Sequence, residues 1–151
     1  MRKLIAVVLF SICCVSYGAT FQFSDAVRNA ELDAIESTIG TSPTLKILSG
    51  SLEADCATGE SGTVLATITL PSDWMAAASS GSKALSGTWE DSSADATGTA
   101  GHFRIYSGST CEIQGDVTAN GGGGAMTMAN TSIASGQTVT ISTFTLTAGN
   151  P

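Results

Sequence analysis

The chain has 151 residues and carries 13 acidic against 6 basic side chains, a formal net charge of −7. No basic run occurs, which excludes nucleic-acid binding through phosphate neutralisation, and an anionic membrane surface would repel the chain. The length suits one domain with a real core and is too short for two.

Residues 1–18 predict a leader that resembles a signal peptide. Two basic residues precede an apolar run at 4–15, and small residues stand just before Ala19, where cleavage would occur. The run is shorter than the roughly 20 residues that a membrane-spanning helix needs. Cleavage would leave a single domain, 19–151, in which four basic residues face thirteen acidic ones, a formal charge of −9. The alternatives are an extended gene start and a retained anchor.

Residues 24–39 predict the one helix of the chain. Ser24 is a favourable N-cap residue and Gly40 is a typical stop signal. The apolar residues that share one side are Leu32, Ile35 and Ile39, widened by Val27, Ala30 and Ala34. We expect this side to pack on a sheet. The side that carries Glu36 is expected to face solvent.

From about residue 44 onward the apolar period changes from 3.6 to 2, which indicates strands. Clusters of Gly, Ser, Asn and Asp separate the alternating runs. The predicted strands are 45–47, 64–70, 84–89, 102–106, 112–118, 125–128 and 138–147. This number of short strands predicts a mainly β fold, an antiparallel β-sandwich or jelly roll with one N-terminal α-helix.

The last predicted strand, TVTISTFTLT, changes its alternation halfway. Val139 and Ile141 have one parity and Phe144 and Leu146 have the other, so a regular strand would turn the two pairs to opposite faces. A bulge at 142–143 would point both pairs inward. The alternative is a strand that is buried on both faces.

Two segments are predicted to be loops, 90–101 and 119–124. Both are rich in small polar residues or glycine. The glycine run in 119–124 lacks the Gly-Lys-Ser/Thr ending of a phosphate-binding loop. We expect it to connect strands 112–118 and 125–128 as a hairpin.

Cys56 and Cys111 are the cysteines that remain outside the leader. In an oxidising compartment they would form one disulfide, which in the loop-entropy model is worth about 4 kcal/mol. The alternative is two buried free thiols. With a single histidine in the chain, a zinc site would have almost no ligands, so no metal or cofactor is predicted.

No residue is assigned a catalytic role. His102 is the only histidine, and a structural position on a strand is the favoured interpretation, because no GxSxG motif accompanies it. Glu90, Asp91 and Asp95 could gather around calcium, but EF-hand spacing is absent and a solvated loop is favoured.

Trp74 and Trp89 are the candidates for contact with a ligand or a partner. Exposed aromatic rings on a β-sandwich can stack on sugars. The favoured interpretation is that the core uses both rings, since the chain has few aromatic residues and tryptophan is usually well buried.

Four segments resemble a family of small tailed-bacteriophage proteins that are encoded among head and tail genes. They are FSDAVRNAELDAIESTIG, LKILSG, SGTVLATITLPSDWMAAASSGSKALSGTWEDSSADATGTAGHFRIY and TSIASGQTVTISTFTLTAGN. The resemblance covers 19–150 and its order of motifs is fairly specific. It implies a structural, virion-associated protein that is not an enzyme, and it supplies no catalytic or ligand residues. Members of the family begin near the position of Ala19, without a leader.

The expected function is that of a phage accessory subunit in the virion, either a capsid decoration protein or a tail-associated protein. Its partners would be other virion proteins and further copies of itself, in a homo-oligomer such as a trimer. The alternative is a secreted or periplasmic binding module that recognises surface glycans, which requires a functional leader. A small hydrolase is the least favoured interpretation.

Overall fold

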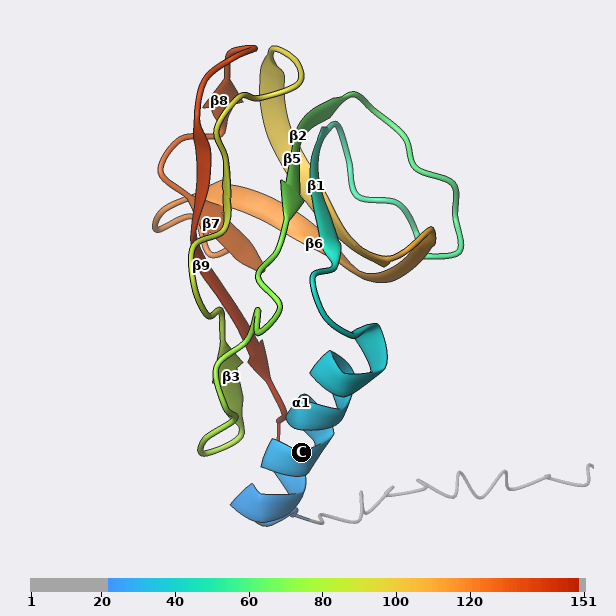
Figure 1. Ribbon diagram of the computed structural model, residues 1–151, viewed down its shortest axis with the longest axis vertical. Helices are drawn as coiled ribbons and strands as arrows, with labels where there is room; N and C mark the ends of the chain where they lie inside the picture. Colours follow the sequence, from blue (N-terminus) through green and yellow to red (C-terminus); the bar gives the residue numbers. More distant parts are fainter. Residues whose placement is uncertain (1–21, 150–151) are drawn as a thin grey trace, which may run out of the picture.

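The computed structural model describes residues 22–149 (Figure 1). The predicted leader, 1–18, lies outside the described residues. One helix precedes a series of short strands, so the mainly β fold with one N-terminal helix is confirmed. Within 22–149, no helix has both the length and the apolar character that crossing a bilayer requires.

The strands form one hydrogen-bonded path in the order β2-β1-β5-β6-β7-β9-β3, with β4 paired to β9 and β8 paired to β5. This sheet curls into a half-barrel in which β2 comes close to β4, the short strand paired with β9, while β3 lies beside α1 (Figure 1). The bounds are β1 Thr44–Ser49, β2 Val64–Thr69, β3 Ser82–Ala84, β4 Glu90–Asp91, β5 Gly98–Ser107, β6 Thr110–Ala119, β7 Met126–Met128, β8 Ser132–Ile133 and β9 Val139–Thr147.

The helix, α1, extends over Asp25–Ile39, as predicted. The Ser24 hydroxyl accepts a hydrogen bond from the Val27 amide at 3.4 Å and caps its N-terminus. Gly40, with φ of 87°, ends it and donates its amide hydrogen to the Glu36 carbonyl.

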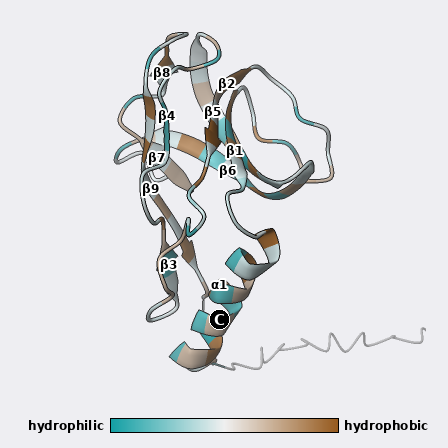
Figure 2. Ribbon diagram, viewed as in Figure 1, coloured by the Kyte–Doolittle hydropathy of each residue, from teal (hydrophilic) through white to brown (hydrophobic). Residues whose placement is uncertain are grey.

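The apolar side of α1 packs on the sheet, but it is narrower than predicted. Leu32 and Ile39 are buried and Ile35 is half-buried against the core. The residues expected to widen this side, Val27, Ala30 and Ala34, are exposed. Figure 2 shows the resulting mixture of hydrophobic and hydrophilic positions along the helix.

Glu36 contacts β3 and does not face solvent, which corrects the prediction for this residue. Lys83 of β3 is only 2% exposed, and its ammonium lies 2.7 Å from Asp33 Oδ1 and 2.8 Å from Glu36 Oε2. A buried ammonium requires counter-charges, so these two carboxylates hold the β3 segment against the helix.

The predicted loop 90–101 is partly strand, because it begins with β4 and ends inside β5. Its first part bridges β4, which is paired with β9, to β2. The Asp95 amide donates to the Leu65 carbonyl at 2.8 Å, and the Thr67 amide donates to Asp91 Oδ2 at 3.1 Å. The segment therefore covers the outer edge of β2. The run predicted at 84–89 contributes only its first residue to β3.

The predicted hairpin between 112–118 and 125–128 is wrong, because β6 and β7 pair in parallel. The chain leaves β6, folds back along it and then reverses again. The Gly124 amide bonds to Thr118 Oγ1 at 3.0 Å, and a Cβ on Gly122 would lie 2.7 Å from the Thr118 side chain. Only glycine fits a backbone that returns so close to the strand that it has just left.

The bulge predicted in the last strand is confirmed. Thr143 of β9 pairs with Thr127 of β7. The next pair joins Ile141 to Met128, so Ser142 is the extra residue. The side chains that consequently point into the core together are Val139, Ile141 and Phe144.

Candidate functional site

Trp74 and Trp89 lie in the core and are at most 1% exposed, so neither ring offers a face to a ligand. Their centroids are 6.0 Å apart, and Trp89 also contacts Phe144 at 5.4 Å. The Trp74 indole donates to the Gly40 carbonyl and the Trp89 indole to the Ser86 carbonyl, each at 3.1 Å. A curled sheet needs large side chains to fill its centre, and the burial of both tryptophans argues against the possible contact role.

Cys56 and Cys111 form a disulfide with a Cα–Cα distance of 5.3 Å, as predicted. Cys111 belongs to β6, whereas Cys56 lies in the connection between β1 and β2. This connection, residues 50–63, is called the β1–β2 loop below. The disulfide fixes the loop to the sheet.

Arg104 of β5 lies beneath the same loop, on the face of the sheet that the loop covers, and is 1% exposed. Its Nη2 donates to the carbonyls of Cys56 and Thr58 at 2.8 and 2.9 Å, and to that of Asp55 at 3.4 Å. Its Nε contacts Cys111 Sγ at 3.3 Å. A planar guanidinium can serve several acceptors at once, so one side chain organises the turn around the disulfide.

His102, also on β5, is fully buried by the loop. Its Nε2 lies 3.1 Å from Glu53 Oε2, and its Nδ1 lies 3.4 Å from the Gly50 carbonyl oxygen. Both ring nitrogens therefore face loop groups rather than a serine or threonine hydroxyl. A nucleophile-activating role is not what this geometry favours.

The carboxyl group of Glu53 has a low pKa in the folded protein. Burial opposes its charge, but the hydroxyl and amide of Ser61 donate to Oε1 at 2.7 and 2.8 Å. These bonds, with the nearby His102, outweigh burial and lower the pKa of Glu53 to about 2. The carboxylate is thus an anchor of the loop.

The outer rim of the loop holds a further polar group. Lys46 Nζ and the Tyr106 hydroxyl both contact Glu60 Oε2 at 2.8 Å. Burial and the hydrogen bond to Glu60 raise the pKa of Tyr106 to about 12. An open depression of about 370 Å³ lies here, lined by Cys56, Ala57, Thr58, Gly59, Glu60, Arg104, Tyr106, Ser109 and Cys111.

The three carboxylates that could have gathered around calcium accept hydrogen bonds from threonines instead, two of them from Thr67. Asp91 accepts from the Thr67 amide, Asp95 from the Thr67 hydroxyl and Glu90 from the Thr140 hydroxyl. Within the described part of the chain, no three His, Cys, Asp or Glu side chains are grouped to hold a metal ion.

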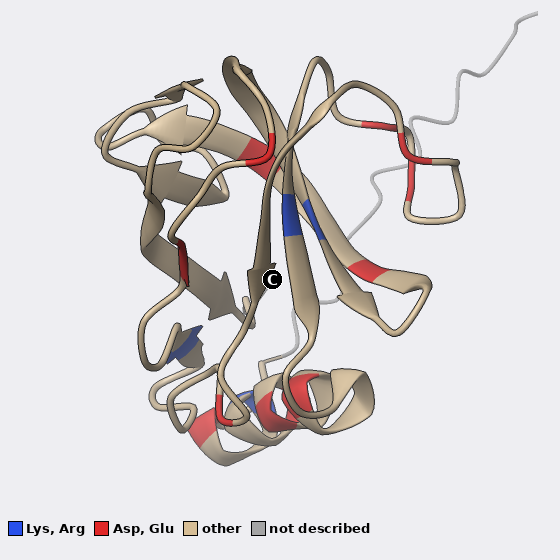
Figure 3. Ribbon diagram, turned by 45° about the horizontal axis from the view of Figure 1, so that its top comes forward, with Lys and Arg blue, Asp and Glu red and all other residues tan. Residues whose placement is uncertain are grey.

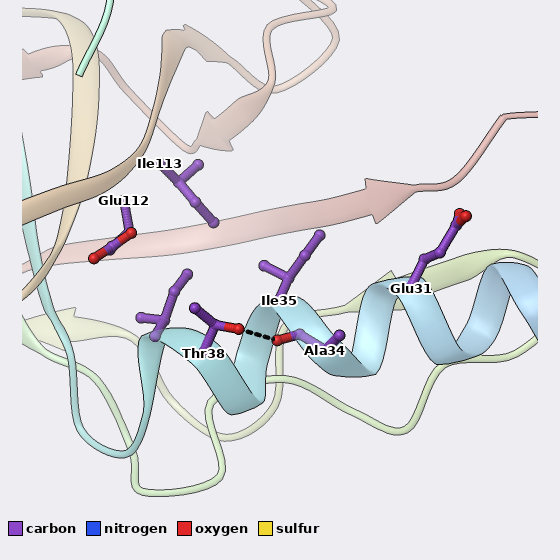
Figure 4. Close-up of a pocket in the computed structure, with 7 residues that line it drawn as sticks. Glu31, Ala34, Ile35, Thr38, Glu112 and Ile113 are labelled. Atoms are coloured by element: carbon purple, nitrogen blue, oxygen red, sulfur yellow. Dashed lines mark hydrogen bonds between the residues drawn. The ribbon is translucent and has the colours of Figure 1, made fainter. Parts of the chain in front are cut away.

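An open groove of about 300 Å³ lies between α1 and β6 (Figure 4). Ile35 of the helix and Ile113 of the strand point toward each other across the groove, with Glu31 and Glu112 farther out on either side. The other lining residues are Ala34, Thr38 and Ile39. Sequence reasoning missed this groove, because nothing in the two segments indicates that they meet.

Comparison with protein-family models, curated proteins and solved structures gives no match. Two features of the described residues therefore remain to define function. One is the β1–β2 loop, held by a disulfide and by buried charges. The other is the groove between α1 and β6.

Proposed function

We propose that the protein is a non-catalytic structural subunit of a tailed-bacteriophage particle, either a capsid decoration protein or a tail-associated protein. The observation that supports this most is the use of the buried charged and ionisable side chains. In residues 22–149 they are Glu53, Lys83, His102 and Arg104, and each holds a loop or the helix against the sheet. The resemblance of 19–150 to phage structural proteins gives the proposal its biological setting.

A domain of this kind acts by being displayed in many copies. Symmetric particles use small subunits through repeated contacts, and avidity lets modest interfaces suffice. We infer a homo-oligomer, with a trimer as the expected form. The acidic surface (Figure 3) makes like-charged copies repel, so their contacts would use apolar surface rather than charge pairs.

The disulfide is compatible with a location in a phage particle. Disulfides persist in oxidising surroundings, which a released particle meets outside the host cell. The same bond would also suit a secreted or periplasmic protein if residues 1–18 act as a leader. The glycan-binding alternative loses its predicted platform, because both tryptophans are buried.

Peptide mass spectrometry of purified particles tests the location. We expect peptides of this chain in stoichiometric amounts, and the same data report the mature N-terminus. Light scattering of the purified protein tests the oligomer. Absence from particles defeats the virion proposal, and a monomer at high concentration defeats the oligomer.

The non-catalytic proposal has its own test. We expect no cleavage of glycan, ester or peptide substrates that depends on His102. A hydrolytic activity that His102→Ala abolishes, while circular dichroism at the assay temperature shows that the variant is still folded, would show that the protein is an enzyme.

A further inference from the structure

The groove between α1 and β6 borders an unpaired stretch of strand edge. β6 pairs with β5 over its first part and with β7 only at Val117–Ala119. The stretch 111–114 thus has a strand neighbour on one side, and no backbone group of residues 22–149 bonds to its other side. An open edge beside an apolar groove is the arrangement that binds an added strand.

A bulge shapes this edge. Cys111 pairs with Tyr106 and Ile113 with Ile105, so Glu112 is an extra residue without a partner in β5. Bulges re-aim side chains at sheet edges. In Figure 4 the Glu112 side chain lies beside the groove, on the strand that faces α1. A charged, bulged edge disfavours pairing with its own copy, because two such carboxylates would repel.

Both acidic side chains of the groove lack a partner within residues 22–149. Glu31 and Glu112 are exposed, and neither has a hydrogen-bond or ion-pair partner among residues 22–149. Between them lie the apolar side chains of Ile35 and Ile113. The groove therefore suits an apolar segment that also carries positive charge.

A second copy of the folded domain has no free cation to supply. Every basic side chain of residues 22–149 is engaged internally: Arg28 with Asp25, Lys46 with Glu60, Lys83 with Asp33 and Glu36, and Arg104 with carbonyls of the β1–β2 loop. The charges therefore favour another polypeptide over a second copy of the folded domain. Residues 1–18 of this chain also place Arg2 and Lys3 before an apolar run, and hydrogen exchange of the isolated full-length protein separates that source from a different protein.

We propose that this groove binds an extended apolar segment of another protein, flanked by lysine or arginine, as a strand added to the edge at 111–114. Its backbone pairs with this edge, its apolar side chains contact Ile35 and Ile113, and its cations meet Glu31 and Glu112. This proposal rests on the proposed function in one respect, the source of the partner. In a phage particle the partner would be a neighbouring protein.

The test is selection of peptides from a random displayed library on the full-length protein. We expect alternating apolar peptides with flanking basic residues. The charge-reversal variant Glu31→Lys/Glu112→Lys should bind them roughly tenfold or more weakly and should select acidic-flanked peptides instead. Asp73→Lys, an exposed acid outside the groove, is the matched control and should leave affinity within about twofold.

Hydrogen exchange then locates the binding. A selected peptide should slow exchange of amides within 111–114 at least roughly tenfold, which a purely side-chain contact would not do. Protection elsewhere, or basic peptides that bind the charge-reversal variant equally well, would overturn the proposal. So would a library without binders, or slow exchange of this edge in the isolated protein, which would mean that another part of the chain or a second copy covers it. Specific peptide binding by a protein that is absent from particles would defeat only the proposed function.

Discussion

The Arg104 guanidinium satisfies three carbonyls of the β1–β2 loop while it is itself almost completely buried. Arg104→Met would keep much of the volume and leave those carbonyls unpaired. We expect a loss of about 3 kcal/mol in the free energy of unfolding, measured by urea denaturation. The free energy of unfolding of Arg104→Lys should lie between those of wild type and Arg104→Met, because an ammonium cannot reproduce the fork of donors.

Lys46→Met is the control for this experiment. Its ion pair with Glu60 is partly exposed, so its removal should change the free energy of unfolding by about 1 kcal/mol or less. Equal losses in the Lys46 and Arg104 variants would show that the guanidinium does not organise the loop.

Glu53 gives the protein a specific sensitivity to acid. Its pKa is lowered from 4.5 to about 2 by folding, so the folded state favours its charged form. This contribution to stability is complete above about pH 4.5 and is lost as the pH falls through about 2. We expect wild type to exceed Glu53→Gln in urea midpoint at pH 6 and the difference to shrink towards pH 2. A constant difference over this range would contradict the low pKa.

At the scale of the helix, the two buried sides of α1 make different contributions. Leu32→Ala should cost about 2–5 kcal/mol, as a buried large-to-small change. Glu36→Ala should cost about 2 kcal/mol, because it removes a carboxylate from the buried ammonium of Lys83. Val27→Ala, on the exposed side, should lie within about 0.5 kcal/mol of wild type. Thermal or urea unfolding ranks the three variants. An unchanged free energy of unfolding in Glu36→Ala would contradict the contact between Glu36 and Lys83.

Local chemistry explains which elements could be predicted from sequence. The cap at Ser24, the stop at Gly40 and the bulge at Ser142 depend on neighbouring residues only, and the structure has all three. The environment of Glu36 could not be predicted, because Lys83 approaches it from a distant strand. The parallel pairing of β6 and β7 was also missed, since a short glycine-rich connection normally indicates a hairpin.

At the scale of the whole molecule, the disulfide joins two parts of the chain that are 55 residues apart. Its reduction should lower the free energy of unfolding by about 4 kcal/mol through the larger freedom of the unfolded chain. Urea unfolding with and without reductant measures this. Native material that contains two alkylatable thiols would contradict the bond itself.

The candidate site could be predicted only in part, because it is built from long-range contacts. The pairing of Cys56 with Cys111 followed from elimination. The anchoring roles of His102 and Arg104 did not, since alternation along β5 suggested a solvated face that the β1–β2 loop in fact covers. Burial of Trp74 was the favoured interpretation on composition alone, but its partners Trp89 and the Gly40 carbonyl come from distant parts of the chain and could not be predicted.

The position of β5 in the middle of the sheet also affects the order in which the chain can fold. Thr44 at the start of β1 pairs with Tyr106 near the end of β5. One edge of β1 therefore stays unpaired until a strand about sixty residues downstream is available. During synthesis on a ribosome, β1 and β2 can meet early, but the half-barrel cannot close until β5 has emerged. Closure also needs β9, because β3 and β4 pair with it and Phe144 belongs to the core. Nascent chains that stop before Thr147 should therefore remain sensitive to protease, and longer ones should become resistant together.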